Sequence, residues 1–315
     1  MVRCIVSCFI VLFVQKYDSM KNNLFFPFAL ELYNKRYIAQ EISYHTWYDS
    51  RQMILAFRTF CEKILRNRDL QIADISIDIL HQYKRYCFET KHNTAITVNR
   101  KLHPVIFSLD KACINGILDS YKLQMLKTVS GQIRPHRYGN EAEKLSAADN
   151  DCHVRHLDDR QLKRLLEYGQ SCQDSAVRDT IDIFFFSFHA CGLRISDIIT
   201  LEWSQVNVKK ASLSKVIVKS KTHLSIPLSE PALAILERWH SKNPSGRFVF
   251  GMLPDGFDIS DDVALSRAID NRNRTLLRRL SAIGRKLKFP APLGMHVARH
   301  SFAVKALNDS RVDVH

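Results

Sequence analysis

The sequence predicts a mainly α-helical protein with one small β-hairpin or sheet, an α+β fold in which an all-α domain precedes a mixed domain. Three observations predict this class. Apolar residues recur at helical spacing along most of the chain, one short segment alternates as strands do, and residues 122–155 lose periodicity. The length of 315 residues and the hydrophobic content of 46% are sufficient for two separate cores.

Residues 1–23 are interpreted as an N-terminal extension outside the fold. They begin with an apolar run behind Arg3 that is too short to span a bilayer comfortably and lacks a small-x-small cleavage pattern. Met20 follows closely, which suggests that the first 19 residues come from a start site assigned too early. A signal-like anchor is the alternative.

Residues 24–121 are predicted to form the all-α domain. Helices are expected over residues 44–61, 72–89 and 93–116, where apolar residues stand at helical spacing. The third helix carries Arg100 and Lys101, two candidates for contact with phosphate groups. A solvated helix face is the alternative for any single basic side chain.

Residues 122–155 are predicted to link the two domains. The segment gathers glycine, proline, serine and charged residues and loses the apolar periodicity. Because it is long for a connection inside one compact domain, we place the domain boundary here.

Residues 156–315 are predicted to form the mixed domain. The hairpin is expected over residues 213–229, where two segments rich in valine and isoleucine flank a short turn with Lys219 and Lys221. Helices are expected over residues 156–168, 178–192, 231–242, 266–289 and 296–307, and a short helix with Asp197 and Leu201 is expected directly after Arg194. The second of these is so apolar that we expect it to be a buried helix.

The charge balance indicates a polyanionic partner such as DNA or RNA. Lysine and arginine number 46 against 32 acidic residues, which gives a formal net charge of +14. A generically basic soluble protein is the alternative. The helix over residues 266–289 favours DNA contact, because no acidic residue follows Asp270 while Arg274, Arg278 and other basic residues crowd it.

The eight cysteines predict neither a zinc site nor a disulfide scaffold. They are scattered, and no C-x-x-C pair has a second pair at zinc spacing. Reduced thiols in a bacterial cytoplasm are the simplest interpretation. We therefore expect no metal.

Arg194 and the hairpin lysines are the first candidates for chemistry. Arg194 follows a glycine helix stop and precedes a short helix, so its planar guanidinium is placed to donate to two phosphate oxygens at once. A salt bridge to Asp197 is the alternative. Lys219 or Lys221 is placed on a turn to donate a proton to a leaving oxygen, and a solvated turn is the alternative.

His296 and Arg299 form the second group of candidates. They stand three residues apart and therefore share a helix face. A histidine for proton transfer beside an arginine for charge stabilisation suits phosphoryl transfer. The alternative is a helix start with a structural histidine, and His300 is expected to support or pack beside the pair.

In chain order, the motif G-L-R-I-S-D-I-I-x-L-x-W, a basic hairpin ending in I-P-L, and the motif H-x-x-R-H-S-F-A resemble the tyrosine recombinase (phage integrase) family. The resemblance spans residues 24–315. It implies that residues 24–121 form a helical core-binding domain that contacts DNA and that residues 156–315 form the catalytic domain. The two arginine motifs are the specific part of the resemblance, whereas the N-terminal half and the hairpin give weaker support.

The resemblance also implies roles for the candidates. Arg194 and Arg299 would clamp the scissile phosphate and stabilise its pentacoordinate transition state, and His296 would assist proton transfer. Asp197 would support the first arginine. No cofactor, neither ATP nor metal, would be needed, because the family's phosphotyrosine intermediate keeps the bond energy.

The catalytic lysine of the hairpin is left open between two residues. Family members usually carry it eight residues before the proline of the closing strand, which is Lys219 here. The common K-T form points instead to Lys221. Either lysine would protonate the leaving 5′-hydroxyl.

The family's nucleophile is a tyrosine that lies beyond the second arginine and takes the DNA 3′-phosphate covalently. No tyrosine occurs here after Tyr168, and the 16 residues that follow Arg299 contain no L-G-H motif. Tyr138 and Tyr168 are poor substitutes. We therefore interpret the sequence as cut short at its C-terminal end, and we predict that it binds DNA but lacks the nucleophile.

The partners implied by the resemblance are a specific double-stranded DNA site, further copies of the chain in a tetramer, and accessory DNA-bending proteins. Two alternatives stay open. One is a catalytically inactive DNA-binding regulator or competitor, and the other is an unrelated basic α-rich DNA-binding protein. Convergence of Arg194, His296 and Arg299 on one site would exclude the second alternative.

Overall fold

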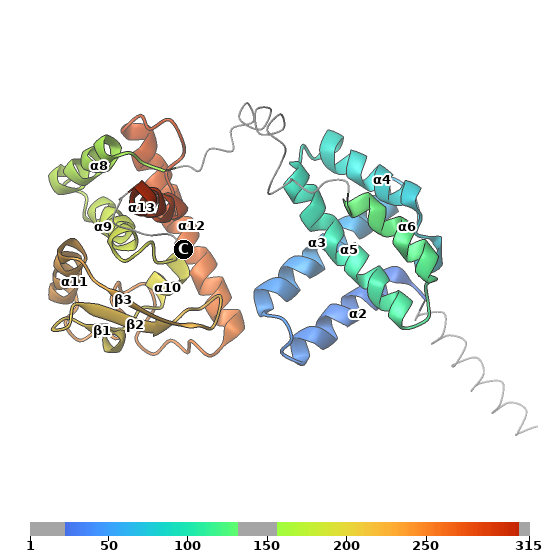
Figure 1. Cartoon of the computed structure of the whole chain (residues 1–315), viewed down its shortest axis with the longest axis horizontal. Helices are drawn as coiled ribbons and strands as arrows, with labels where there is room; N and C mark the ends of the chain where they lie inside the picture. Colours follow the sequence, from blue (N-terminus) through green and yellow to red (C-terminus); the bar gives the residue numbers. More distant parts are fainter. Residues whose placement is uncertain (1–22, 132–155, 309–315) are drawn as a thin grey trace, which may run out of the picture. The chain divides into compact units, whose positions relative to one another are not determined.

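The computed structural model describes residues 23–131 and 156–308. The chain divides into two compact units, Met1–Ala147 and Ala148–His315, which are described one at a time (Figure 1). Within the described ranges, no helix is both long and apolar enough to cross a membrane. The predicted extension over residues 1–23 lies outside these ranges except for Asn23.

The described part of the first unit is built from helices. They are α2 (Phe25–Ile38), α3 (Tyr44–Lys63), α4 (Ile77–Arg85), α5 (Ala95–Ile114) and α6 (Ser120–Gly131). Phe57 lies in their common core, with its ring centroid 5.8 Å from that of Phe25 and 4.9 Å from that of Tyr83. These fully buried rings join α2, α3 and α4 into one core.

The prediction of a linker over residues 122–155 is wrong for residues 122–131, because these belong to α6. Leu123, Leu126 and Val129 are buried in a stripe with three-residue spacing, and α6 packs on α5 and α4. This stripe is a single row of apolar side chains among polar ones. It finds a surface to pack against only when the earlier helices are folded. Residues 132–155 lie outside the described ranges.

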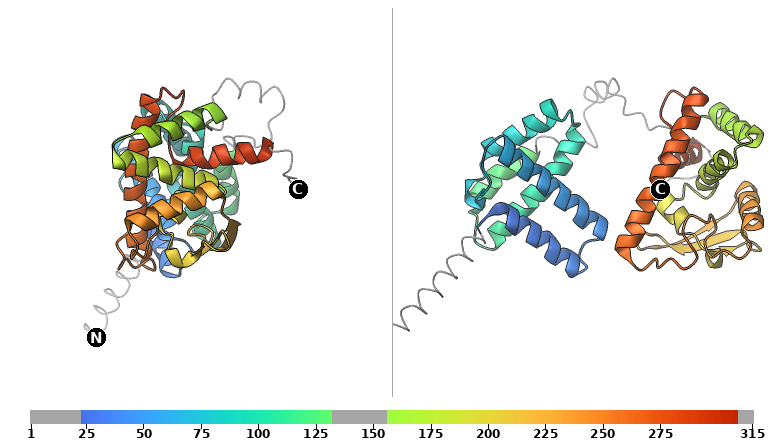
Figure 2. Two further views of the ribbon diagram at one scale, coloured as in Figure 1. Left: turned by 90° about the vertical axis from the view of Figure 1, so that its left-hand side faces the viewer. Right: turned by 180° about the vertical axis from the view of Figure 1, so that it is seen from behind.

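In the second unit, the other helices pack around one central helix. The elements of this unit are α8 (Asp159–Ser171), α9 (Ser175–His189), α10 (Ile195–Ile199), β1 (Val206–Asn207), β2 (Ser212–Val216), β3 (His223–Pro227), α11 (Glu230–Lys242), α12 (Asp262–Lys286) and α13 (Met295–Asn308). Helix α9 packs against α8, α11, α12 and α13, and it is buried from Thr180 to Phe188 except at Asp182. Figure 2 shows α12 as a long helix along one edge of this unit.

The three strands form one antiparallel sheet in the order β1-β2-β3. Strands β2 and β3 pair from Ser212 opposite Pro227 to Val216 opposite His223, which confirms the predicted hairpin. The hairpin closes where the Ile217 N–H donates to the Thr222 carbonyl at 2.9 Å. The short strand β1 was not predicted. Together the helices and the small sheet confirm the predicted mainly α fold class.

Candidate functional site

The two arginine motifs meet at the junction between α9 and α10. Gly192 ends the α9 turn with φ +67°, a conformation that favours glycine, and Arg194 is the N-cap residue of α10. The Arg299 Nη1 donates to the Gly192 carbonyl at 2.7 Å. A Cβ on Gly192 would lie 3.1 Å from the Arg299 Cγ. Glycine is therefore needed here both for the turn and for the close approach of Arg299.

Helix α13 supplies His296 and Arg299, as predicted from their spacing. The helix is anchored by Ser301, which is buried and accepts a hydrogen bond from the Leu157 N–H at 2.8 Å. Its buried side also includes Met295, Val297 and Ala298. This packing leaves Arg299 half-buried and directed to the α9–α10 junction.

His296 lies among positive charges. Burial lowers the pKa of His296, and four groups lower it further, in decreasing order His300, Arg299, Arg194 and Lys219. The rings of His296 and His300 have centroids 6.3 Å apart. The structure thus brings together the candidates from α10, the hairpin and α13 around one imidazole. Each of these effects disfavours the imidazolium form of His296.

Replacing Lys219 by alanine is expected to raise the pKa of His296, because one of the charges that disfavour the imidazolium is removed. Lys221→Ala removes the same charge from the same turn and serves as the matched control, with a smaller expected change. Both pKa values can be measured by NMR titration of the imidazole in the full chain. An equal rise in the two variants would contradict the closer approach of Lys219.

Asp197 is fully buried and links α10 to the hairpin. Its Oδ1 accepts a hydrogen bond from the Val218 N–H at 2.8 Å. Burial raises the pKa of Asp197, and the Val218 N–H, Lys215, Arg194 and Arg299 oppose this rise, in decreasing order. No ion pair joins Arg194 and Asp197 in the described part of the chain, so the alternative of a simple salt bridge is wrong.

Lys215 is a residue of this site that the sequence analysis missed. It is 4% exposed, and its Nζ donates to the Asp197 carbonyl at 2.7 Å and to the Thr200 Oγ1 at 2.9 Å. Burial lowers its pKa to about 8, against the opposing charges of Asp197 and Glu202. A signal was available, because the alternation of β2 places Lys215 on the same face as the buried Leu213.

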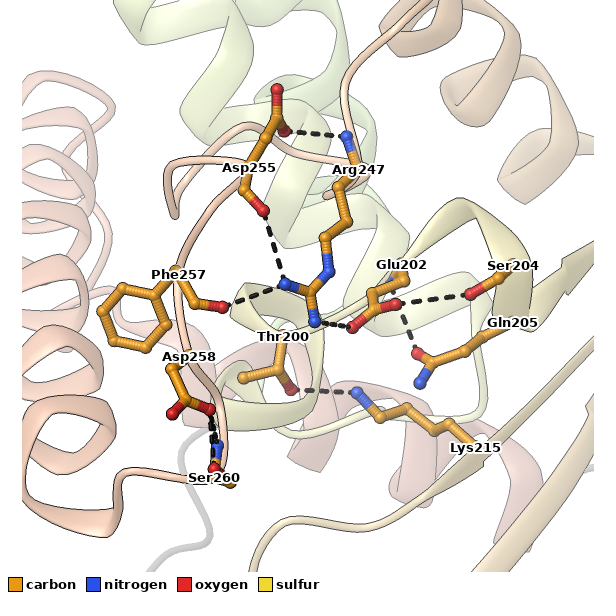
Figure 3. A network of polar contacts seen from close by, with 10 residues as sticks. All are labelled: Thr200, Glu202, Ser204, Gln205, Lys215, Arg247, Asp255, Phe257, Asp258 and Ser260. Atoms are coloured by element: carbon orange, nitrogen blue, oxygen red, sulfur yellow. Dashed lines mark hydrogen bonds and ion pairs between the residues drawn. The ribbon is translucent and has the colours of Figure 1, made fainter.

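A second polar network holds the segment before α12 (Figure 3). The Arg247 guanidinium donates to the Glu202 Oε1 at 2.8 Å and to the Phe257 carbonyl at 2.9 Å. The Arg247 N–H also donates to the Asp255 Oδ1 at 2.7 Å. These contacts fix the loop that leads into α12 against the chain that follows α10.

The predicted DNA-contact residues differ in their surroundings. Arg274 and Arg278 are exposed on α12, whose opposite face buries Leu276 and Leu280. The other exposed basic residues of α12 are Arg267, Arg272, Arg279, Arg285 and Lys286. In the first unit, by contrast, Arg100 is paired with Asp49, and the Lys101 Nζ donates to the Asn93 Oδ1 at 2.6 Å.

No group of three or more histidine, cysteine, aspartate or glutamate residues is placed to hold a metal ion in residues 23–131 and 156–308. The same ranges contain five free cysteines, Cys61, Cys87, Cys113, Cys172 and Cys191.

A helical unit followed by a mixed unit with a small antiparallel sheet is the architecture of the integrase class of fold. Residues 155–315 match the Phage integrase family, and this match covers half of the chain. The chain belongs to the phage integrase family. This membership excludes the alternative of an unrelated basic α-rich protein.

Two curated relatives are tyrosine recombinases by name. The chain is 28% identical to tyrosine recombinase XerD of Pseudomonas putida over 120 residues, which are 38% of each chain. It is also 28% identical to tyrosine recombinase XerC of Alcanivorax borkumensis over 158 residues, which are 49% of this chain and 47% of that protein. The chain thus spans less than half the length of these relatives.

Solved structures show the same fold at low identity. An integrase of the Tn1549 transposon in complex with a circular intermediate DNA has a TM-score of 0.62 and 13% identity, over 90% of this chain and 87% of that one. A lambda integrase dimer bound to a COC′ core site has a TM-score of 0.55 and 16% identity, over 90% of each chain. These similarities support the fold alone.

Proposed function

We propose that this chain is part of a site-specific DNA recombinase whose phosphate site is formed by Arg194, Arg299, His296 and a hairpin lysine. The observation that carries the proposal is the 2.7 Å contact between the Arg299 Nη1 and the Gly192 carbonyl, which brings the second arginine motif to the junction where Arg194 begins α10. The charges of Arg299, Arg194 and Lys219 also act together on His296 and lower its pKa. Such a concentration of positive charge suits the pentacoordinate transition state of phosphoryl transfer, in which negative charge builds up on the equatorial oxygens.

Each residue type fits one task in this reaction. The two guanidinium groups donate to the non-bridging oxygens of the scissile phosphate. The imidazole of His296 accepts or relays a proton, and Lys219 or Lys221 protonates the leaving 5′-oxygen. Asp197 supports the site indirectly, since its carboxylate accepts the Val218 N–H next to Lys219. Lys219 is favoured over Lys221 by its effect on His296.

We also propose that this polypeptide of 315 residues binds DNA without cutting it. No tyrosine follows Tyr168 in the sequence. Tyr168 lies on α8, where the Lys286 ammonium stands 5.0 Å from its ring centroid, so it is already engaged elsewhere. Tyr138 lies outside the described residues.

A suicide substrate tests this proposal. A duplex with a nick next to the cleavage point traps any covalent phosphotyrosine, because the cut fragment diffuses away. The chain is expected to shift the duplex in a native gel and to give no adduct that survives denaturing electrophoresis. A covalent adduct would contradict the absence of a nucleophile, and a complete family member on its own site serves as the positive control.

A second candidate function is a DNA-binding regulator that competes for recombination sites, because the exposed basic residues of α12 suit DNA binding without any cleavage step. In-frame codons for a tyrosine segment directly after His315 in the genomic DNA would decide against it. The complete enzyme would act as a tetramer on two duplexes with accessory DNA-bending proteins, in the bacterial cytoplasm.

A further inference from the structure

A buried lysine outside the predicted set stands next to the phosphate site. Lys215 points inward from β2, between the hairpin and α10, and Figure 3 shows its side chain directed to Thr200. Lysine is almost never buried unless its ammonium is paired. Here two protein oxygens accept from the Nζ, and the carboxylates of Asp197 and Glu202 act on its charge.

A contribution to folding stability does not by itself explain a buried ammonium group at position 215. A buried ion pair is weak evidence for stabilisation, because apolar residues of similar volume often serve as well or better. The neighbouring strand position Leu213 is filled by such an apolar residue. Lys215 therefore calls for a role that an apolar side chain cannot fill.

The contacts of Lys215 indicate such a role. The Lys215 Nζ binds the carbonyl of Asp197, and the carboxylate of the same residue accepts the Val218 N–H. Two points on the hairpin, three residues apart, are thus attached to one residue of α10. Lys219 directly follows Val218 in the hairpin, and Arg194 is the N-cap residue of α10. The position of Lys219 relative to Arg194 is set by this double attachment.

We propose that Lys215 is a positioning residue that holds Lys219 against the arginines of the phosphate site by fixing the hairpin to Asp197 and Thr200. The use of this positioning in phosphoryl transfer rests on the proposed function. The geometric part stands on the free protein alone. The Asp197 Oδ2 accepts no hydrogen bond from the described residues, so the link to the hairpin depends on the Asp197 carbonyl and Oδ1.

The test replaces Lys215 by methionine, which keeps the length of the side chain and removes its charge and donors. In the free full chain, release of the hairpin is expected to raise the pKa of His296 towards its value in Lys219→Ala. Adding Lys219→Ala to Lys215→Met should then give little further change. Hydrogen exchange of the Val218 N–H should accelerate about tenfold or more, since it is held by a hydrogen bond to a charged group.

Two variants serve as controls. Thr180→Val removes the hydrogen bond from the Thr180 Oγ1 to the Ala176 carbonyl at 2.7 Å, far from the hairpin in the sequence. This is the counterpart of the bond from the Thr200 Oγ1 to the Ser196 carbonyl at 2.9 Å, which Thr200→Val also removes. Thr180→Val should leave the pKa of His296 and the exchange rate of the Val218 N–H unchanged. Thr200→Val keeps the charge of Lys215 and removes one of its acceptors, so it should shift both readouts in the same direction as Lys215→Met. If Lys215→Met does not fold, the same two measurements on Thr200→Val test the proposal.

The outcomes separate the two proposals. An unchanged His296 pKa and an unchanged Val218 exchange rate in both Lys215→Met and Thr200→Val would overturn the positioning role, whatever the DNA result. If the wild-type chain binds no duplex DNA while the NMR shifts occur, the proposed function fails and the positioning of Lys219 stands. A plain structural role predicts lower stability with no shift at His296.

Discussion

Raising the salt concentration from about 50 to about 200 mM is expected to weaken duplex DNA binding by this chain about 10³-fold or more. The physical reason is the release of counterions from each phosphate that a basic side chain neutralises. The chain has a net charge of +14, and seven basic residues are exposed on α12 alone. Fluorescence anisotropy with a labelled duplex measures the slope of log K against log salt. Affinity that ignores salt would count against every DNA-binding function considered for this chain.

The same binding experiment, repeated with α12 variants, measures how much this helix contributes to the salt dependence of DNA binding. Arg274→Ala and Arg278→Ala are each expected to reduce the salt slope by about 1, as loss of one phosphate contact does. Arg238→Ala is the matched control, because the Arg238 guanidinium on α11 is already paired with Asp182, with Nη2 and Oδ1 2.7 Å apart. If the control lowers the slope as much as the α12 variants do, α12 is not the DNA-contact surface.

Truncating Asp197 to alanine is expected to lower the free energy of unfolding of the second unit by about 1–3 kcal/mol, the cost of leaving a buried donor unsatisfied. The change leaves the buried Lys215 ammonium without this carboxylate and the Val218 N–H without its acceptor. Urea denaturation followed by the fluorescence of Trp203 and Trp239 measures the loss. Both tryptophans lie in the second unit, and a Trp47→Phe background removes the signal of the first unit.

A second aspartate variant, Asp179→Ala, serves as the control for this measurement of unfolding free energy. Asp179→Ala breaks an ion pair with Lys242, which is largely exposed, and should cost about 0–1 kcal/mol. Adding Lys215→Met to Asp197→Ala should restore part of the lost stability, because the unpaired buried charge is then removed. Equal losses in Asp197→Ala and Asp179→Ala would show that Asp197 and Lys215 are not coupled in the folded protein.

Local patterns in the sequence were sufficient for most of the fold. The buried helix α9 and the hairpin β2–β3 follow from long apolar and alternating runs, and both are confirmed. Helix α6 was missed, since three apolar residues in one stripe give a weak pattern. Their burial depends on surfaces that α4 and α5 provide.

Some residues of the candidate site could be selected from the sequence, and others only from the folded structure. Arg194, His296 and Arg299 were found because each stands in a short motif whose residue types suit phosphate chemistry. Lys215 was missed because a lysine in a strand is normally taken as solvated, and only the contact with α10 shows its burial. Likewise, the sequence left Lys219 and Lys221 open, whereas the folded turn gives Lys219 an effect on His296.

The sequence by itself determined most of the helices, the hairpin, the basic character and the chemical types of the candidate site, because propensity, periodicity and motif spacing act over a few neighbouring residues. Only the tertiary structure decided that Arg299 contacts Gly192, and that Asp197 joins α10 to the hairpin. These contacts join residues far apart in the chain. Burial and charge at such places are set by the packing of separate elements, which no local pattern encodes.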